Sequence, residues 1–415
     1  MKKVKRIVCA TGLLILFLTN SLKSQNNYFH YKFLNLQENR FRNIEDTLHY
    51  RRLMKKFSKT CRTDTIPINI LHMGDSHMQA GFYSNEIREN FHKYFNNDTL
   101  ANLGFIFPYN AAQTNNPGHY HVESSGKWYS CKAVENKSCS QLGLSGINLK
   151  TKDTLATIKI KVKDYFPFLD YPIKEAELFC NYSETDYNLC INGKKIQNRR
   201  DTNTTHIKLK HSTDTLFLEI RRKKKNPNNS WFKLSGIVIK QKDHALNYHS
   251  IGVNGATVRS YLKCGLLPAH LKKLQPDWVI ISLGTNEGYN LQFNGQEFYR
   301  SLTKLVKTIK QNTNNTYILL TTPGHSLREG KFYNPNNALV RDQIIRTAIK
   351  NDCGYWDFFS VMGDTDAINR WNKEQLTASD KLHLNKDGYQ LKANLFFDAF
   401  LKCFHTFFEQ DLLKP

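Results

Sequence analysis

The hydrophobic positions of the chain follow two different periodic patterns. The first pattern covers residues 67–113 and 248–415. There, short apolar runs alternate with longer stretches whose apolar residues recur at helical spacing. The apolar runs predict buried strands at Ile68–Met73, Trp278–Leu283, Tyr317–Thr321 and Tyr355–Phe359. Helical patterns run from Ser76 through Phe91, along Phe298–Ile309 and Leu339–Ala348, and from Lys386 to Phe404. Strands that alternate with helices predict an α/β fold of three layers (α/β/α), with a parallel sheet between two layers of helices.

The second pattern, between residues 114 and 247, is the alternation of apolar and polar residues that is typical of half-buried strands. Asn192-Gly193 is a strong signal for a hairpin turn within it. We expect strands at Ala156–Val162, Glu175–Tyr182, Tyr187–Ile191, Lys194–Ile196, His206–Leu209, Thr215–Ile220 and Phe232–Ile239. The pattern predicts an all-β sandwich inserted between the first and second strand–helix units of the α/β domain. The basic run Arg221–Lys225 is interpreted as a solvated hairpin tip rather than a binding patch.

The N-terminus has the pattern of an export signal. Four basic residues among the first six precede an apolar run from Ile7 to Leu18, and Ser24 is small enough to mark a cleavage point. The run is too short to favour a membrane span, so an uncleaved anchor is the weaker interpretation. Residues 1–24 are therefore predicted to be a signal peptide, and residues 25–66 a linker followed by an amphipathic helix. We expect an exported protein, periplasmic, envelope-associated or secreted, with no stable membrane span after cleavage.

The net charge of the chain limits the classes of partner that it is expected to bind. The formal net charge is +23, and residues 1–24 contribute five basic and no acidic residues to it. A surface this basic favours anionic partners. The sequence contains no nucleic-acid-binding motif, so we expect no nucleic acid and favour an anionic polymer of the cell envelope.

Nine cysteines are present, and export would permit disulfides. The close pairs Cys131/Cys139 and Cys180/Cys190 are the natural candidates, although spacing alone does not fix the connectivity. The sequence has neither a C-x-x-C pair nor a His-Glu-x-x-His motif, so no metal site is predicted.

Four short polar stretches lie at or beside the ends of the predicted strands. They are Gly74-Asp75-Ser76-His77, Gly252-Val253-Asn254-Gly255, Gly284-Thr285-Asn286-Glu287 and Asp380-Lys381-Leu382-His383. In a parallel sheet such stretches gather at the carboxyl edge, where ligands bind. Each stretch alone is a common turn sequence, but their order and their placement at successive strand ends make the set specific.

These stretches contain the groups that nucleophilic catalysis requires. Ser76, which begins a predicted helix, can act as a nucleophile only if a base takes its proton. We expect His383 to be that base, and Asp380 to fix its tautomer and stabilise the imidazolium. The backbone N–H groups of Ser76 and Gly255 and the side chain of Asn286 would form an oxyanion hole, where one donor is typically worth ~3 kcal/mol. This chemistry needs neither a metal nor an organic cofactor.

The four stretches resemble those of the SGNH (GDSL-type) hydrolase family. The resemblance covers residues 67–112 and 248–405 and implies a flavodoxin-like sheet, with the roles given above for the five matching residues. His77 stands where the family usually has Leu, and Glu287 where it usually has Asp. With Gln79 and the inserted β block, these departures make the chain similar to the peptidoglycan O-acetylesterases, in which a jelly-roll-like, carbohydrate-binding-type module is inserted after the first stretch. The resemblance implies removal of O-acetyl groups from that glycan.

Three further polar residues are candidates for substrate contact. His77 and Gln79 would face the site if the first helical turn after Ser76 points that way. His325 follows the end of a predicted strand and could reach substrate, although a loop histidine without a role is the simpler interpretation.

The expected function is that of an exported serine esterase acting on an acetylated envelope glycan. Three alternatives stay open: an acetyltransferase with the same acyl-enzyme, an esterase for another polysaccharide, and a non-catalytic wall-binding protein. The complete set of catalytic positions disfavours the last. Trp128, Tyr187 and Trp231 of the β block could stack on sugar rings, but aromatic residues usually serve packing first. The sequence does not define the oligomeric state.

Overall fold

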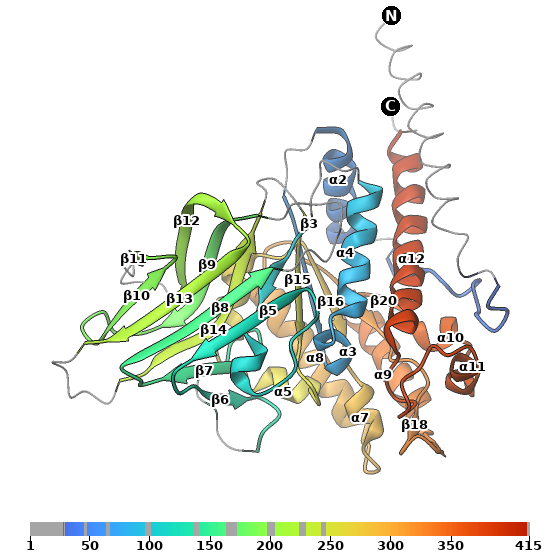
Figure 1. Cartoon of the computed structure of the whole chain (residues 1–415). Coiled ribbons are helices and arrows are strands. Elements are labelled where there is room, and N and C mark those ends of the chain that lie inside the picture. The colour runs from blue at the N-terminus through green and yellow to red at the C-terminus, as the bar shows by residue number, and fades with distance from the viewer. Residues whose placement is uncertain are drawn as a thin grey trace, which may run out of the picture.

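The computed structural model describes residues 28–412 except 29, 45–47, 64–66, 96–100, 137, 138, 140, 163–171, 197–203, 224–229 and 242–245. The predicted signal peptide and the tip of the basic hairpin lie outside the described residues. The chain forms an α/β body and, beside it, a β body (Figure 1). Among the helices that the structure describes, none has the length and hydropathy needed to cross a bilayer.

The α/β body is built on a seven-stranded sheet in the order β1-β20-β17-β16-β2-β15-β3. All of its neighbouring strands are parallel except β1 and β20. The strands are β1 (Phe41–Arg42), β2 (Ile68–Gly74), β3 (Ala101–Asn102), β15 (Leu246–Gly252), β16 (Trp278–Ser282), β17 (Tyr317–Thr321) and β20 (Gly354–Trp356). In this register Gly74, the last residue of the inner strand β2, pairs with Gly252 and Ser282. The carboxyl ends of the neighbouring strands β15, β2 and β16 are therefore level.

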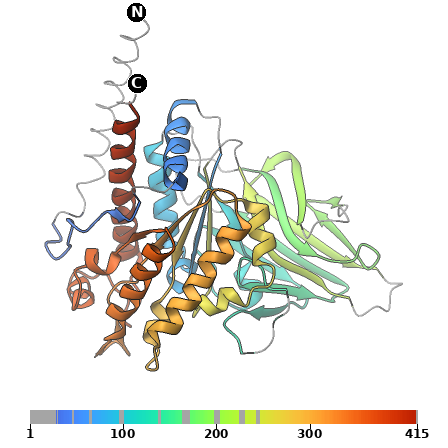
Figure 2. The ribbon, with the colours of Figure 1, turned by 180° about the vertical axis from the view of Figure 1, so that it is seen from behind.

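Helices cover both faces of this sheet, as Figures 1 and 2 show from opposite sides. One face carries α2 (Leu48–Thr63), α4 (Phe82–Tyr94) and α12 (Lys386–Leu412). The other carries α5 (Val258–Leu262), α6 (Leu267–Leu274), α8 (Gly295–Asn312) and α9 (Asn336–Lys350). The connections contain α3 (Ser76–Gln79), α7 (Thr285–Tyr289), α10 (Phe358–Met362), α11 (Ala367–Lys373) and the hairpin of β18 (Leu327–Arg328) and β19 (Phe332–Tyr333). The predicted α/β/α architecture is confirmed.

The β body consists of two antiparallel sheets that share a buried apolar core. One has the order β11-β10-β13-β8-β5, and the other the order β12-β9-β14-β7-β6, with β4 added beside β14. Its elements are β4 (Gly104–Ile106), the 3-10 helix η1 (Tyr109–Ala112), β5 (Tyr120–Ser125), β6 (Tyr129–Lys132), β7 (Ile147–Thr151), β8 (Leu155–Val162), β9 (Ile173–Asn181), β10 (Tyr187–Ile191), β11 (Lys194–Ile196), β12 (Thr204–Thr213), β13 (Thr215–Arg222) and β14 (Phe232–Lys240). The predicted inserted β structure is confirmed, and its strand pairing begins at Gly104, ahead of residue 114.

Two of the expected elements differ in the structure. The strand predicted at Tyr355–Phe359 ends at Trp356, because the Asp357 side chain accepts a hydrogen bond from the Ser360 N–H and starts α10 there. The helix predicted from Ser76 through Phe91 is divided into α3 and α4 at Gly81. This glycine has φ +82°, and a Cβ on it would lie 2.5 Å from Pro117 Cβ, so the chain turns where only glycine fits.

The cysteines confirm one expected disulfide and contradict the other. Cys131 and Cys139 form a disulfide, whereas Cys180 and Cys190 are free. Cys180 is buried on β9, but Cys190 lies on β10 of the other sheet, between the inward-facing Leu189 and Ile191. Its side chain therefore points away from the core that contains Cys180. Within the described residues, the one grouping with metal-ligand spacing is Cys131, Glu135 and Cys139, and its two sulfur atoms are joined in the disulfide.

His270 on α6 makes stability depend on pH. It is 2% exposed, and its Nδ1 accepts a hydrogen bond from the Leu144 N–H of the β body at 3.1 Å. Burial lowers its pKa from 6.5 to about 4, so stability is fully present above pH 6.5 and is lost as the pH falls toward 4. Between pH 7 and pH 4, we expect the unfolding free energy of the wild type to fall by up to ~3 kcal/mol more than that of His270→Gln.

Denaturant unfolding at the two pH values measures this difference. The exposed His211→Gln serves as the control and should keep the wild-type pH dependence. If His270→Gln loses as much stability as the wild type on acidification, the assignment to His270 is wrong.

Candidate active site

Ser76 is the first residue of α3 and directly follows the turn at the end of β2. The Asp75 carboxylate caps this short helix by accepting a hydrogen bond from the His77 N–H at 3.0 Å. A Cβ on Gly74 would lie 2.2 Å from Met78 Cγ and 3.0 Å from Ser282 O. The glycine therefore allows the chain to reverse at once from strand to helix, which presents Ser76 at the carboxyl edge of the sheet.

The structure brings Ser76, His383 and Asp380 into one hydrogen-bonded chain. The distance from Ser76 Oγ to His383 Nε2 is 2.8 Å, and that from His383 Nδ1 to Asp380 Oδ2 is 2.7 Å. A carboxylate accepts the Nδ1 proton, which leaves Nε2 as the acceptor that faces the serine hydroxyl. The geometry is the one that the sequence predicts for a nucleophile, a base and the carboxylate that orients the base.

Asp380 is held by its own loop. Its Oδ1 accepts hydrogen bonds from the N–H groups of Leu382 at 3.0 Å and His383 at 2.9 Å. Burial alone would raise the pKa of this carboxyl, but the hydrogen bonds from the His383 backbone and ring and from the Leu382 backbone outweigh it and lower the pKa below its usual range. Asp380 therefore stays ionised at neutral pH and can stabilise an imidazolium.

The expected oxyanion donors lie around the same edge. Gly255 has φ +76°, and no atom lies within 4 Å of the position where a Cβ would stand. Within the described part of the chain, the backbone N–H groups of Ser76 and Gly255 have no acceptor. Asn286 Nδ2 donates to Ala256 O at 2.9 Å and to Asp75 Oδ2 at 3.3 Å, so its side chain is already anchored between the first two loops.

Two buried carboxyl groups join the loops behind these donors, and the sequence analysis assigned no role to either. Asp75 is 1% exposed and contacts Asn286, and burial raises its pKa to about 6. Glu287 Oε1 accepts a hydrogen bond from the Val258 N–H at 2.7 Å, and burial raises the pKa of Glu287 to about 7. Their only signal in the sequence is that each is adjacent to a candidate catalytic residue.

Gln79 does not offer its side chain to a substrate. It is 2% exposed, its Nε2 donates to Thr114 Oγ1 and Asn115 O, and its Oε1 accepts from the Asn254 N–H at 2.8 Å. The expectation that it contacts substrate is corrected, because the amide is fully used in joining α3, the chain after η1 and the Asn254–Gly255 loop.

Replacing Gln79 with Leu should therefore cost stability more than substrate affinity. We expect Gln79→Leu to lower the unfolding free energy by ~2–4 kcal/mol, because buried backbone and side-chain groups lose their partners. The KM for a small acetyl ester should stay within about twofold of the wild-type value while kcat falls, because the loop carrying Gly255 is less well held. Denaturant unfolding and steady-state kinetics measure the two effects, with the exposed Gln292→Leu as control. A large rise in KM at unchanged stability would restore the substrate role.

His77 lies against the ring of His383 rather than in open solvent. The His77 and His383 ring centroids are 4.9 Å apart, and His77 Nδ1 is 2.8 Å from Tyr389 Oη. Burial, and after it the charges of His383 and Lys392, hold the pKa of His77 well below its usual value. His77 is therefore neutral, which leaves room for a positive charge on His383. Sequence reasoning missed Tyr389 and Lys392, because nothing in the sequence of α12 sets them apart.

His325, the third candidate for substrate contact, is buried in the loop that follows β17. It is 2% exposed and packs near the rings of Tyr333 and Phe359. Neither of its ring nitrogens has a hydrogen-bond partner among the described residues. With His77 it lines a pocket beside the Ser76 turn.

The three aromatic candidates of the β body have different environments. Tyr187 is 1% exposed within the sandwich core, so it is not available to stack on a sugar. Trp128 donates its indole N–H to Ser125 O and packs edge-on against Phe232. Trp231 is half-buried and is flanked by the ammonium groups of Lys150 and Lys152, 4.6 and 4.3 Å from its ring centroid.

An α/β/α sheet with a serine, a histidine and an aspartate hydrogen-bonded at its carboxyl edge is the arrangement of a serine hydrolase. Sequence comparison matches residues 221–391 to the GDSL-like Lipase/Acylhydrolase family. Over these residues the chain is similar to the GDSL/SGNH hydrolases. The matched segment contains Gly255, Asn286, Asp380 and His383, whereas Ser76 precedes it, so the place of Ser76 rests on the geometry.

Among solved structures, a peptidoglycan O-acetylesterase matches with a TM-score of 0.71 at 20% identity, over 85% of this chain and 96% of that chain. This likeness establishes a shared fold.

An acetyl xylan esterase matches with a TM-score of 0.31 at 20% identity, over 37% of this chain and 80% of that chain. Axe2, an acetylxylan esterase from Geobacillus stearothermophilus, matches with a TM-score of 0.29 at 20% identity, over 38% of this chain and 73% of that chain. The last two likenesses are too weak to inform the substrate. Among curated proteins, no sequence match is found.

Proposed function

We propose that this chain is an exported serine esterase that removes O-acetyl groups from a cell-envelope glycan, with peptidoglycan as the leading substrate. The observation that carries the proposal is the hydrogen-bonded chain from Ser76 through His383 to Asp380, next to two backbone N–H groups without acceptors. The choice of glycan is supported by the shared fold with a peptidoglycan O-acetylesterase, which extends over the β body as well as the α/β body.

In the first half of the reaction, His383 Nε2 takes the proton of Ser76 as Oγ attacks the acetyl carbonyl. The negative charge on the carbonyl oxygen is stabilised by the N–H groups of Ser76 and Gly255. Asn286 joins them when its Nδ2 exchanges the longer of its two contacts, the one to Asp75 at 3.3 Å, for the oxyanion. His383 then protonates the leaving sugar oxygen, and the acetyl group stays on Ser76.

In the second half, His383 takes a proton from water, which attacks the acetyl carbonyl of the acyl-enzyme. The same donors stabilise the second oxyanion, and His383 returns the proton to Ser76 as acetate leaves. Asp380 stabilises the imidazolium in both halves and does not itself take up a proton. The chemistry uses this chain's own groups throughout.

The basic character of the chain supports an anionic polymer as the substrate. The net charge is +23, and Lys150 and Lys152 flank the half-buried Trp231 on the β body. An indole ring can stack on a sugar, and the two ammonium groups close to it can neutralise nearby carboxylates. Binding of the polymer should therefore weaken as the salt concentration rises.

Acetate release from O-acetylated peptidoglycan tests the proposal, with Ser76→Ala and acetylated xylan run in parallel. Release from peptidoglycan that disappears in Ser76→Ala would support both the mechanism and the substrate. Release from xylan alone would overturn the substrate and keep the mechanism. If acetate appears only when a glycan acceptor is omitted, and acetylated acceptor forms when it is present, the protein is a transferase. No reaction with any acetyl ester would overturn the proposal in favour of a wall-binding protein.

A further inference from the structure

A pocket lies beside the Ser76 turn, between the ends of β2, β16 and β17 and the helices α10 and α12. The cavity itself offers about 30 Å³ to the centre of a water-sized molecule, and the empty space reaches about 540 Å³ only when open solvent is counted. Asp75, Thr321, His325 and Lys392 lie in its floor and are each 6% exposed or less, whereas Pro323 and other rim residues are partly exposed. Ser76 is not among the residues that line the pocket, but its neighbours Asp75 and His77 are, so the pocket shares the turn that carries Ser76.

Several polar atoms around this pocket have no partner within the part of the chain that the structure describes. They are His77 Nε2, both ring nitrogens of His325 and Tyr83 Oη, and each is buried. Lys392 Nζ lies over the rings of Tyr83 and Phe358 at 4.8 and 4.5 Å and has no hydrogen bond to a described acceptor. Buried polar groups in folded proteins are almost always paired, so their convergence on one pocket indicates a polar ligand.

The other polar groups of the lining already have partners. The hydroxyls of Ser282 and Thr321 are 2.7 Å apart, and Ser282 also contacts His72 Nε2. The Asp75 carboxylate is engaged by the His77 N–H and by Asn286. The groups that are left without partners are thus an ammonium, which can only donate, and a phenol and imidazole nitrogens that can donate.

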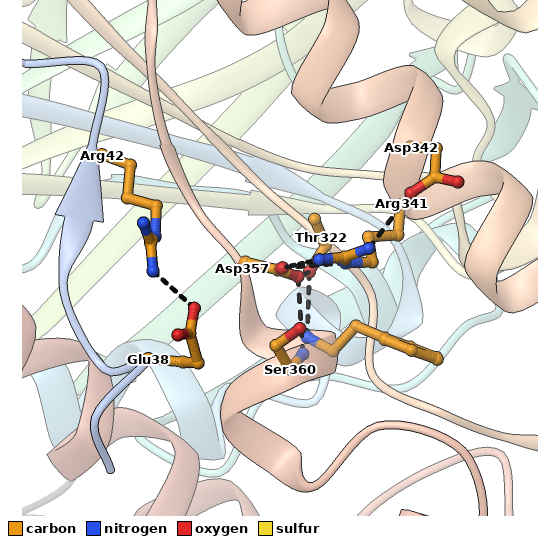
Figure 3. Close-up of polar contacts among 8 residues, drawn as sticks. Glu38, Arg42, Thr322, Arg341, Asp342, Asp357 and Ser360 are labelled. Atoms are coloured by element: carbon orange, nitrogen blue, oxygen red, sulfur yellow. Dashed lines mark hydrogen bonds and ion pairs between the residues drawn. The ribbon is translucent and has the colours of Figure 1, made fainter. Parts of the chain in front are cut away.

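The segment Thr322–Ser326 lines the pocket, and a network around the Arg341–Asp357 ion pair fixes its first residue, Thr322 (Figure 3). Arg341 Nε donates to Asp357 Oδ2 at 2.8 Å, and Thr322 Oγ1 donates to Asp357 Oδ1 at 3.1 Å. Thr322 Oγ1 also accepts a hydrogen bond from the Phe359 N–H at 3.0 Å. This network holds the start of the Thr322–Ser326 segment against α10, so the pocket is a preformed feature rather than a loose loop.

We propose that this pocket binds a small carboxylate, and that its natural ligand is the acetate released at Ser76 or a carboxylate substituent of the glycan. The choice between these two sources rests on the proposed function, whereas the preference for a carboxylate does not. A carboxylate offers acceptors only, in a number that matches Lys392, His325 and Tyr83.

The charge balance around Lys392 agrees with this assignment. Burial lowers the pKa of Lys392 to about 8, with Asp75 acting in the opposite direction, so the ammonium is still charged at pH 7. The pKa of His325 is lowered, mainly by burial, so the imidazole is neutral and can donate from one nitrogen. Asp75 is the one acid in the lining, and its oxygens are engaged with the Ser76 turn. A carboxylate is therefore the ligand that would pair Lys392.

His77 connects the pocket to the proposed catalytic base, because it lines the pocket and contacts His383. One face of the His77 ring lies against His383, and its Nε2 has no protein partner, while His77 itself lines the pocket. A carboxylate that accepts a hydrogen bond from Nε2 would fix the tautomer of His77 and place negative charge one ring away from His383. Bound acetate should accordingly alter turnover at Ser76.

The test is a titration of the full-length Ser76→Ala protein with ¹³C-labelled acetate, followed by NMR line broadening. This protein cannot turn over an ester, so binding is measured apart from the reaction. We expect Lys392→Met in this background to weaken acetate binding by roughly tenfold or more, since a charge-assisted hydrogen bond is lost. His325→Phe should weaken it as well while keeping the ring contacts, and the matched surface variant Lys304→Met should bind like the parent. Thermal unfolding shows whether each variant is folded. If Lys392→Met does not fold, acetate binding by His325→Phe tests the proposal in its place.

A second arm separates the two sources of the carboxylate. N-acetylmuramic acid that displaces labelled acetate, when N-acetylglucosamine does not, would identify the glycan substituent as the ligand. Displacement by neither sugar would identify free acetate. Absence of acetate binding, or equal binding by the parent, Lys392→Met and His325→Phe, would overturn the proposal and leave water as the occupant. Lys392-dependent acetate binding in a protein that releases no acetate from any ester would overturn the proposed function and keep this site.

Discussion

Ser76→Ala should lower kcat for hydrolysis of an aryl acetate by about 10⁵-fold, leaving only the smaller rate enhancement that the oxyanion hole and substrate binding supply. The reason is that Ser76 Oγ is the hydroxyl hydrogen-bonded to His383 Nε2, at 2.8 Å, and alanine leaves the base without a nucleophile to activate. Steady-state release of the phenolate measures the loss. Ser124→Ala, an exposed serine on β5, is the matched control and should keep the wild-type rate.

The same geometry predicts how a second substitution combines with the first. Because Ser76, His383 and Asp380 act as one unit, Ser76→Ala/His383→Ala should be no slower than Ser76→Ala alone. Two losses that multiply would show that His383 acts independently of Ser76. A Ser76→Ala protein that keeps a tenth of the wild-type kcat would exclude Ser76 as the nucleophile.

Much of this site could be predicted from the sequence, because Ser76, Gly255 and Asn286 each follow a strand of the parallel sheet, while Asp380 and His383 precede the strongly patterned helix α12. The run Ile68–Met73 is mostly apolar and mostly buried, as expected of a strand covered on both faces, and it forms β2, an inner strand of the sheet. Once such strands are parallel, the residues after them must meet at one edge. The pairing of Gly74 with Gly252 and Ser282 makes that edge level, which brings the Ser76 turn and the Gly255 and Asn286 loops together.

The features that the sequence did not reveal depend on contacts between distant segments. β1 joins the sheet as an antiparallel edge strand although Phe41–Arg42 is too short to have a pattern. The separation of Cys180 from Cys190 depends on which sheet each strand enters, and the spacing of two cysteines carries no such information. The pocket beside Ser76 combines His77, His325 and Lys392 from three parts of the chain. In the sequence, Lys392 is an ordinary residue of a helix. Only the packing of α12 on the sheet shows that its side chain is buried.

Gly252→Ala should be among the most damaging single substitutions near the site. A Cβ on Gly252 would lie 2.2 Å from Gln79 N, 2.6 Å from Asp75 O and 2.8 Å from Met78 C. All three are backbone atoms of the turn that carries Ser76, so no side-chain rotation relieves the overlap. We expect the unfolding free energy to fall by about 3 kcal/mol, because β15 and α3 must move apart. A shift of α3 by 1 Å moves Ser76 Oγ away from His383, so kcat should fall by about 10²-fold in the protein that remains folded.

Denaturant unfolding and the rate of aryl acetate hydrolysis test the two parts separately. Gly118→Ala is the matched control, because no atom lies within 4 Å of a Cβ at that position and its φ is ordinary, so its stability should stay within ~0.5 kcal/mol of the wild type. If Gly252→Ala is destabilised but the folded fraction keeps the wild-type kcat, the Ser76 turn tolerates displacement, and the position of α3 does not limit the reaction. If both stability and kcat are unchanged, the close approach of β15 to α3 is not maintained in solution. A joint loss means that the glycine at the end of β15 sets the position of the nucleophile.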